Sequence, residues 1–173
     1  MNKMKAIIVG RFQPLHNGHL DLAKKVREKG YNIVIGIGNN GDKRTSRCPF
    51  LFEEVKKMWL PHLEKLNAKV YCIPDIPNDK EYAEHVEKIT GIQEEDTTLV
   101  SGNEHTIKCF TEYNRIYKVL SPYKDLNCNY PKISGTYIRE LIKENKPWEE
   151  FVPKKTSKVI DEINGIKIIK NLC

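Results

Sequence analysis

The chain has 173 residues, a length that suits one α/β domain with a hydrophobic core. It is 39% apolar and 30% charged, and no apolar run approaches the roughly 20 residues that a membrane-spanning helix needs, so we expect no membrane partner. The net charge of +6 favours anionic partners, a class that includes nucleotides, nucleic acids and acidic lipids. Residues 1–6 lack the long apolar region and the cleavage site of a signal peptide, which predicts a cytoplasmic location.

Short apolar runs alternate along the chain with segments of helical periodicity. The first kind of pattern predicts buried strands, and the second predicts helices with one apolar face. In chain order, we expect a strand over 5–10, a helix over 18–30, a strand over 33–38, a polar loop over 39–48, a helix over 50–66, a strand over 69–74, a helix over 79–89, strands over 97–101 and 115–119, an irregular stretch over 123–131, and helices over 134–144 and 154–164.

This alternation predicts the fold class, α/β, with a Rossmann-like, doubly wound parallel sheet and a helical C-terminal region. The sequence contains no internal repeat, low-complexity tract or linker. We therefore expect a single domain over residues 1–173, with a Rossmann-like core over 1–132 and a helical part over 133–173.

The five cysteines give little indication of chemistry. Their number is odd, and no two of them form a C-x-x-C pair. We therefore expect reduced thiols, with neither a disulfide framework nor a cysteine-rich zinc site.

The segment from Gly10 to His19, with the sequence GRFQPLHNGH, joins the first predicted strand to the first predicted helix. Ligands of an open α/β sheet gather at the carboxyl ends of its strands, and the free N–H groups of a helix start bind anions. His16 and His19 project from neighbouring positions in the first turn, so both can donate to phosphoryl oxygens as charge develops in a transition state. Gly18 would let a phosphate approach the backbone, and Arg11 would add a cation. Taken alone, the two histidines could instead be surface residues or metal ligands, although a zinc site needs further ligands.

The same segment carries a resemblance to a known family. His16-Asn17-Gly18-His19 matches the H-x-G-H signature of the nucleotidyltransferase superfamily, and the longer string resembles the archaeal-type nicotinamide-nucleotide adenylyltransferases. This resemblance implies a Rossmann-like fold and the transfer of AMP from ATP to a phosphate-bearing acceptor.

A second motif, with the sequence ISGTYIR, covers residues 133–139. Ser134 and Thr136 are residue types that cap a helix and offer hydroxyl groups to phosphate, and Gly135 permits close backbone approach. Arg139 lies one turn beyond Thr136 and could face the same anion. From the residues alone, a capped surface helix with a solvated Arg is an equal alternative. In the superfamily that the chain resembles, this motif forms the second half of the ATP triphosphate site.

Further likenesses extend the resemblance over nearly the whole chain. They comprise Pro49-Phe50, the turn Ser101-Gly102-Asn103, Trp148, Val152-Pro153 and the segment 159–165.

The sequence departs from the family pattern where the acceptor is held. Val55 stands where the family has an Arg, so Arg44 or Arg47 could supply the charge instead. Asn39-Asn40-Gly41 replaces a Ser-Ala-Gln segment, and Tyr82 replaces an aromatic residue, often Trp, that stacks on the pyridine ring.

The reaction that the resemblance implies joins ATP to a pyridine mononucleotide, giving NAD and pyrophosphate when the acceptor is nicotinamide mononucleotide. Mg²⁺ is expected as cofactor, bound mainly through the ATP phosphates. The expected catalytic residues are His16, His19, Arg11 and Arg139. The expected binding residues are Gly10, Phe12, Gln13, Gly18, Gly36, Gly38, Asn39, Arg47, Tyr82, Ser101, Gly102, Asn103, Ser134, Gly135 and Thr136.

Three alternatives stay open from the sequence. A related enzyme could use nicotinic acid mononucleotide, flavin mononucleotide or phosphopantetheine as acceptor. A nucleic-acid-binding module would fit the basic charge, but the chain has no stripe of alternating aromatic and basic residues, so we expect no nucleic-acid partner. A non-catalytic nucleotide sensor on the same fold is the third alternative, and the presence of His16, His19 and Arg139 argues against it. Members of the family commonly form homo-oligomers, and we expect one here.

Overall fold

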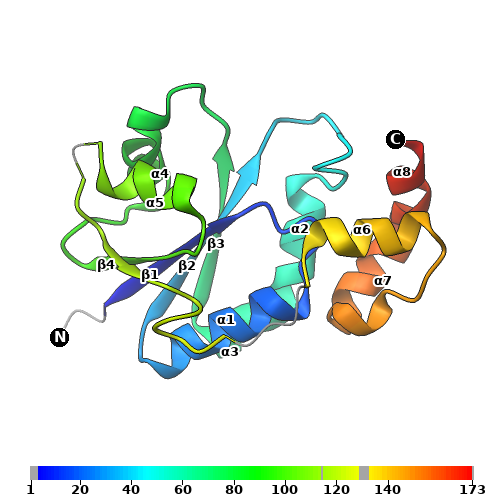
Figure 1. Ribbon diagram of the computed structural model, residues 1–173, viewed down its shortest axis with the longest axis horizontal. Coiled ribbons are helices and arrows are strands. Elements are labelled where there is room, and N and C mark those ends of the chain that lie inside the picture. The colour runs from blue at the N-terminus through cyan, green and yellow to red at the C-terminus, as the bar shows by residue number, and fades with distance from the viewer. Residues whose placement is uncertain (1–3, 114, 129–132, 173) are drawn as a thin grey trace.

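The computed structural model describes residues 4–113, 115–128 and 133–172 (Figure 1). At its centre is a parallel sheet of five strands in the order β3-β2-β1-β4-β5. The strands are β1 (Lys5–Gly10), β2 (Asn32–Asn39), β3 (Ala68–Pro74), β4 (Thr97–Val100) and β5 (Lys118–Leu120). The predicted α/β fold class, with a doubly wound parallel sheet, is therefore confirmed.

Helices connect the strands and form the C-terminal region. They are α1 (Asn17–Glu28), α2 (Phe52–Trp59), α3 (Leu63–Leu66), α4 (Tyr82–Thr90), α5 (Glu104–Thr111), α6 (Gly135–Lys143), α7 (Lys154–Glu162) and α8 (Gly165–Asn171). Short 3₁₀ turns cover Leu60–His62, Asp79–Glu81 and Glu149–Phe151. Among the described residues, no helix combines the length and the apolar character needed to cross a membrane.

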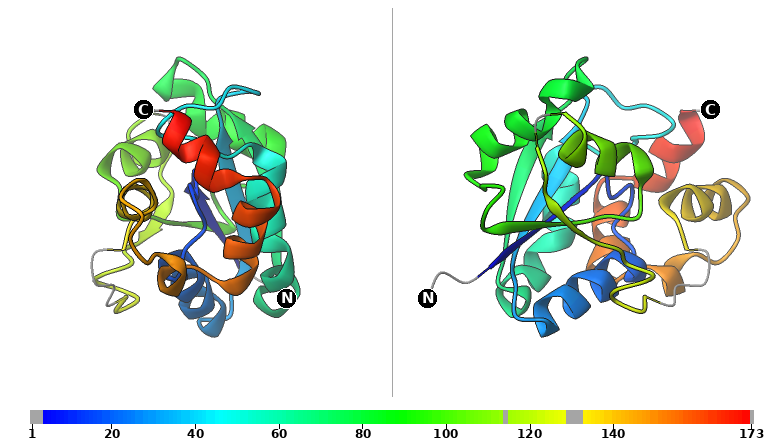
Figure 2. Two further views of the ribbon diagram at one scale, coloured as in Figure 1. Left: turned by 90° about the vertical axis from the view of Figure 1, so that its right-hand side faces the viewer. Right: turned by 60° about the vertical axis from the view of Figure 1, so that its left-hand side comes forward.

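Both faces of the sheet are covered, which explains why the strand sequences are almost continuously apolar. Successive side chains of a strand point to opposite faces. Ala6 and Ile8 accordingly pack in the core beneath α1, α2 and α3, whereas Ile7 packs on the other face with α4 and α5. The C-terminal helices join the first of these cores, where α7 lies beside α2 (Figures 1 and 2).

The order of the strands determines where ligands can bind. The chain winds from β1 to β2 and β3 on one side, and then returns to place β4 and β5 on the other side of β1. The connections that leave the carboxyl ends of β1 and β4 therefore diverge, and this divergence opens a crevice.

The predicted strand over 115–119 is wrong in its position, because β5 begins only at Lys118. The Arg115 side chain reaches to α4, where Nε and Nη2 bind the Glu87 carboxylate at 2.8 and 2.9 Å. The buried Tyr117 donates its hydroxyl to the same carboxylate at 2.9 Å. Residues 115–117 therefore hold α4, and sheet pairing starts only where Lys118 lies opposite Thr98.

Two helices were not predicted from the sequence. The first, α5, begins after Asn103, whose side chain accepts a hydrogen bond from the Thr106 N–H at 2.9 Å and so caps the helix. The second, α8, begins at Gly165, directly after the predicted helix over 154–164. Asn164 has a left-handed conformation with φ of 55° and turns the chain directly into α8.

Two other sequence predictions need qualification. The predicted helix over 50–66 is interrupted at Leu60–His62, where Pro61 stands in a 3₁₀ turn. The irregular stretch contains neither helix nor strand over 123–128, and its residues 129–131 lie outside the described residues. Cys48, Cys72, Cys109 and Cys128 are free thiols, as expected, whereas Cys173 lies outside the described residues.

Candidate active site

A cavity of about 780 Å³ lies at the carboxyl ends of the central strands. Its wall combines the end of β1, the starts of α1 and α6, and the segments that follow β2, β3 and β4. The lining residues are Val9, Gly10, Arg11, Phe12, Gln13, His19, Gly38, Arg47, Asp75, Ile76, Asp79, Tyr82, Asn103, His105, Thr106, Cys109, Gly135, Thr136 and Arg139.

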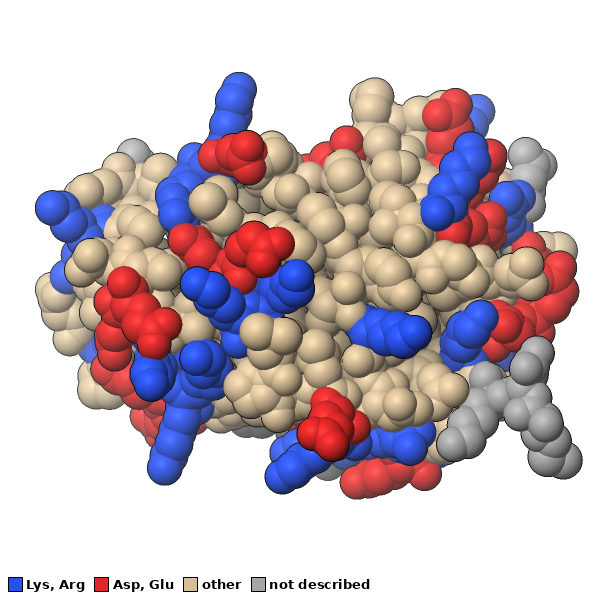
Figure 3. Space-filling model, turned by 180° about the vertical axis from the view of Figure 1, so that it is seen from behind, with Lys and Arg blue, Asp and Glu red and all other residues tan. Residues whose placement is uncertain are grey.

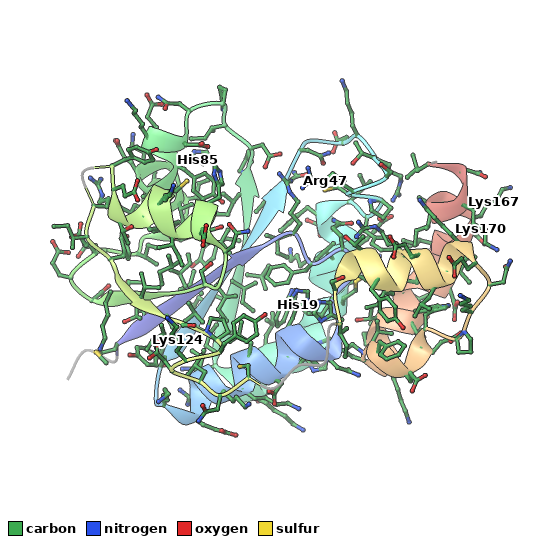
Figure 4. The ribbon with its side chains drawn as sticks, in the orientation of Figure 1. His19, Arg47, His85, Lys124, Lys167 and Lys170 are labelled. Atoms are coloured by element: carbon green, nitrogen blue, oxygen red, sulfur yellow. The ribbon has the colours of Figure 1, made fainter. Side chains whose placement is uncertain are left out.

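The two motif histidines form a stacked pair at the start of α1. Their ring centroids are 3.5 Å apart, and the rings are inclined by only 20°. His19 lines the cavity (Figure 4), whereas His16 is buried and is not part of the lining. The His16 backbone N–H donates to His19 Nδ1 at 3.2 Å, so a neutral His19 carries its proton on Nε2.

Burial keeps both imidazoles neutral. It lowers the pKa of His16 to about 4. It also lowers the pKa of His19 well below its usual value, and the nearby His16 lowers it further. At neutral pH, His19 is therefore a hydrogen-bond donor rather than a cation.

Phe12 supports this pair from within the motif. Its ring packs edge-on against His19 and Trp59, with centroid distances of 4.8 and 5.1 Å. It also lies over Gly10, where an added Cβ would come within 3.0 Å of the ring. Gly10 is therefore needed because the Phe12 ring takes the place of a side chain.

Arg11 stands at the cavity but already has an anionic partner. Its Nη2 group donates to both carboxylate oxygens of Asp75, at 3.0 and 2.9 Å. The side chain also lies across Gly38, where an added Cβ would come within 3.6 Å of Arg11 Cγ. Arg11 thus links the segments after β1 and β3 across the end of β2.

The two motifs meet through backbone groups. Arg139 Nη1 donates to the Gln13 carbonyl at 2.6 Å, and its Nη2 donates to Thr136 Oγ1 at 3.2 Å. A Cβ at Gly135 would lie only 2.6 Å from the same carbonyl oxygen, so the start of α6 can approach this closely only with glycine there. Ser134 caps α6 by accepting from the Tyr137 N–H at 3.1 Å, which agrees with the predicted capping.

Gln13 also anchors the loop between β2 and α2. Its buried side-chain amide donates to the Phe50 carbonyl at 2.8 Å, and its oxygen accepts from the Phe50 N–H at 2.9 Å. Gln13 lines the cavity, but its amide is occupied by this pair, so its backbone is the part nearest a ligand.

This loop and the start of α2 contain the position where the family has an Arg and the two arginines that could replace it. Val55 is fully buried in the core under α2 and does not reach the cavity. Arg44 is engaged with the Glu54 carboxylate at 2.7 and 2.8 Å and with the Pro49 carbonyl at 2.7 Å, so it supplies no charge to the cavity. Arg47 lines the cavity from the same loop (Figure 4).

The opposite side of the cavity comes from the segments after β3 and β4. Tyr82 lies there at the start of α4, with its ring edge-on to Phe110 at 6.1 Å, and burial raises its pKa to about 12. Asn103 and Thr106 line the same side at the start of α5. Asp75, Asp79, His105 and Cys109 also line the cavity and were missed from the sequence.

Several expected site residues are not part of the lining. Gly36 lies in the sheet against the Ile73 side chain, the Asn39 amide contacts Cys72 Sγ at 3.4 Å, and Gly102 lies against the Tyr123 ring. The others are His16, Gly18, Ser101 and Ser134. The remaining expected residues all line the cavity. They are the binding residues Gly10, Phe12, Gln13, Gly38, Arg47, Tyr82, Asn103, Gly135 and Thr136 and the catalytic residues Arg11, His19 and Arg139.

The surface opposite the view of Figure 1 bears on the nucleic-acid alternative. Lys and Arg side chains are interspersed there with Asp and Glu, and the described residues of this face form no continuous basic stripe (Figure 3). Binding of nucleic acid would need such a stripe.

Comparison with known proteins agrees with this geometry. A family model described as cytidylyltransferase-like matches residues 7–141. The nicotinamide-nucleotide adenylyltransferase of Methanococcus maripaludis S2 is 35% identical over 169 residues, which cover 98% of this chain and 95% of that protein. The proteins of the same name from Methanococcus vannielii and Picrophilus torridus are 37% and 34% identical, over 98% of this chain and 95% and 97% of their own lengths.

A solved structure has the same fold. It is a bifunctional NMN adenylyltransferase/ADP ribose pyrophosphatase from Francisella tularensis, complexed with AMP and a Mn ion. It superposes with a TM-score of 0.72 at 17% identity, over 98% of this chain. This chain spans about half the length of that protein, 52%.

Proposed function

The chain belongs to the cytidylyltransferase-like family and is similar over nearly its whole length to archaeal nicotinamide-nucleotide adenylyltransferases, and from this premise we propose that it transfers AMP from ATP to nicotinamide mononucleotide. The products are NAD and pyrophosphate. The observation that carries the proposal is the meeting of the two motifs at one cavity, where Arg139 binds the carbonyl of Gln13 across 126 positions of sequence.

In the proposed reaction, a phosphate oxygen of the mononucleotide attacks the α-phosphorus of ATP. The new P–O bond forms as the bond to the bridging oxygen breaks, and pyrophosphate leaves with the electron pair. The attacking phosphate is already anionic, so no protein base has to remove a proton. This fits neutral His16 and His19, which are hydrogen-bond donors here and not bases.

Catalysis then consists of positioning and charge stabilisation. His19 donates from Nε2 to the phosphoryl oxygens as their charge grows, and His16 holds the ring of His19 in place. Arg47 adds positive charge from the loop after β2, and Arg11, paired with Asp75, places a second guanidinium at the cavity. Arg139, together with the first N–H groups of α6 and the hydroxyl groups of Ser134 and Thr136, binds the β- and γ-phosphates.

The acceptor lies on the side of Tyr82 and Asn103 in this proposal. The Tyr82 ring offers a flat apolar surface to the pyridine ring. Gly38, at the end of β2, also lines the cavity, with the Arg11 side chain across it.

A divalent ion, Mg²⁺, completes the proposal. The lining carboxylates are Asp75 and Asp79, and Arg11 already binds Asp75, so the described lining offers few oxygen ligands. This set fits an ion that is held mainly by the ATP phosphates and water. When bound, Mg²⁺ neutralises phosphate charge. The proposal also includes a cytoplasmic location and assembly with further copies of the chain, as the family resemblance implies.

The test is pyrophosphate release from ATP and Mg²⁺ with a panel of acceptors: nicotinamide mononucleotide, nicotinic acid mononucleotide, flavin mononucleotide and phosphopantetheine. We expect strong release, with formation of NAD, from nicotinamide mononucleotide. Release with only flavin mononucleotide or phosphopantetheine would overturn the proposed acceptor. ATP binding without release for any acceptor would support a nucleotide sensor instead.

A further inference from the structure

Three potential metal ligands gather on the side of the cavity formed by α4 and α5. One ligand atom from each of Asp79, His105 and Cys109 lies within 4.8 Å of the other two. None of the three belongs to the motifs that carry the proposed reaction, whereas His19, at the start of α1, does (Figure 4). All three line the cavity.

Two short capped elements hold these side chains together. His105 and Cys109 are four residues apart on α5 and therefore share one face of this helix. The Asn103 side chain fixes the start of α5. Asp79 is the first residue of the 3₁₀ turn Asp79–Glu81, which is capped by Asn78 through a hydrogen bond from the Lys80 N–H at 3.1 Å.

The spacing of the His105 and Asp79 ligand atoms suits a tetrahedral ion. His105 Nε2 and Asp79 Oδ1 are 3.5 Å apart, which is long for a hydrogen bond. Two ligands bound to one tetrahedral ion through bonds of 2.0–2.1 Å are about 3.3 Å apart. The pair therefore needs only a small adjustment to bind one ion between them.

The burial of the three residues suggests how an ion would enter. Cys109 is only 2% exposed and packs in the core with Phe110 and Tyr117, so its position is fixed. The side chains of His105 and Asp79 are 69% and 54% exposed. An ion arriving from solvent would meet these two first and then reach the thiol behind them.

The donor set decides which ions fit. A thiolate, an imidazole and a carboxylate together favour Zn²⁺ or Co²⁺, whereas Mg²⁺ prefers oxygen ligands. Three protein ligands leave one tetrahedral position open, as in zinc sites that bind an exchangeable water or substrate atom. Because all three side chains line the cavity, this position faces it.

We propose that Asp79, His105 and Cys109 form a site for a zinc-class divalent ion, with an open coordination position toward the nucleotide cavity. This ion is separate from the Mg²⁺ that ATP carries. The open position would accept an oxygen or nitrogen atom of whatever occupies this side of the cavity. The inference rests on these three residues and holds whether or not the proposed acceptor is correct.

The test uses Co²⁺ as a coloured substitute for Zn²⁺, added to the purified, metal-free full chain. We expect one Co²⁺ per chain and the charge-transfer absorption of a cobalt–thiolate bond. Zn²⁺ should displace the colour stoichiometrically, whereas excess Mg²⁺ should not. Absence of thiolate charge transfer in the wild-type chain would overturn the proposal.

Variants identify the site. Cys109→Ser should abolish the charge-transfer band. His105→Ala should weaken Co²⁺ binding more than about tenfold, because it removes a ligand and not only a group that hydrogen-bonds to a ligand. Cys72→Ser and His85→Ala are matched controls outside the cluster and should bind Co²⁺ as the wild type does. A band that persists in Cys109→Ser would overturn the proposal.

Two variants at exposed positions keep the proposal testable if Cys109→Ser does not fold. Asp79→Asn and His105→Ala alter side chains at the surface, so the fold should tolerate both even if Cys109→Ser does not fold. Circular dichroism checks this for every variant. Full Co²⁺ affinity in both exposed variants would contradict the site.

Discussion

On one side of the cavity, the loop before α1 meets the start of α6 through a backbone carbonyl and meets the segment before α2 through a buried amide, whereas on the other side α4 and α5 contribute mainly side chains. The first side depends on Gln13, whose carbonyl receives Arg139 and whose amide pairs with the backbone of Phe50. The second side depends on α5, whose start Asn103 caps, and on the 3₁₀ turn before α4, which Asn78 caps. The difference indicates that the wall proposed to hold the triphosphate is fixed by backbone contacts, while the proposed acceptor wall can change its side chains without rebuilding the fold.

The largest effect should come from the donor on the first side. His19→Ala removes the Nε2–H group that faces the cavity, and loss of one such donor lowers kcat by about 10²–10³. Steady-state pyrophosphate release measures this, with thermal unfolding as a check on the fold. Activity equal to the wild type would remove His19 from the mechanism.

The second-largest effect should be a loss of stability at low pH that originates at His16. The pKa of His16 is about 4 in the folded chain because the ring is buried, and near its usual 6.5 in the unfolded chain. Between these values the unfolded chain binds more protons, so the free energy of unfolding falls as pH drops through this window, on the order of 3 kcal/mol. Urea unfolding at several pH values across the window measures this. The unfolding free energy of His16→Asn should change less with pH than that of the wild type, and an equal dependence on pH would contradict this origin.

A smaller effect is expected where α6 docks. Gly135→Ala places a methyl group against the Gln13 carbonyl, so α6 has to shift, at about 1–3 kcal/mol of unfolding free energy. The shift also moves Arg139, and kcat/KM should fall with it. The matched control for stability is Gly38→Ala, where the nearest atom would be 3.6 Å away and little change is expected. Equal unfolding midpoints for both variants would count against the close contact.

The smallest effect should be found on the acceptor side. Asn103→Ala removes the cap of α5 and should lower the unfolding free energy by about 1 kcal/mol. Asn103→Asp keeps an oxygen acceptor and should retain most of that stability. If both variants lose the same amount in chemical denaturation, the cap is not what Asn103 contributes.

The fold was predictable wherever the sequence pattern is local. Doubly covered strands such as β1 are continuously apolar, and the two motifs lie at the starts of helices, so their positions follow from the chain itself. By contrast, α5 has only eight residues and follows Asn103, which we had interpreted as part of a turn. Its first residue, Glu104, and the cap were the signals that could have indicated it.

The candidate site was predictable only in part. Asp75 and Cys109 have no informative spacing in sequence and line one cavity only because the parallel strands β3 and β4 have their carboxyl ends on the same side of the sheet. The partner of Gln13 lies 37 positions away, so no local pattern could show that its amide is occupied. Val55 is explained by burial in the core, which becomes visible only once α2 has been placed.

The contact between Gly135 and the carbonyl of Gln13 also has an evolutionary consequence. A side chain at position 135 can be accommodated only if the first loop retreats, and the loop cannot retreat while Gln13 holds Phe50. These positions should therefore change together or not at all as relatives diverge. The proposed acceptor wall contributes mainly side chains to the cavity, so new substrates within this fold are expected to arise from substitutions on α4 and α5.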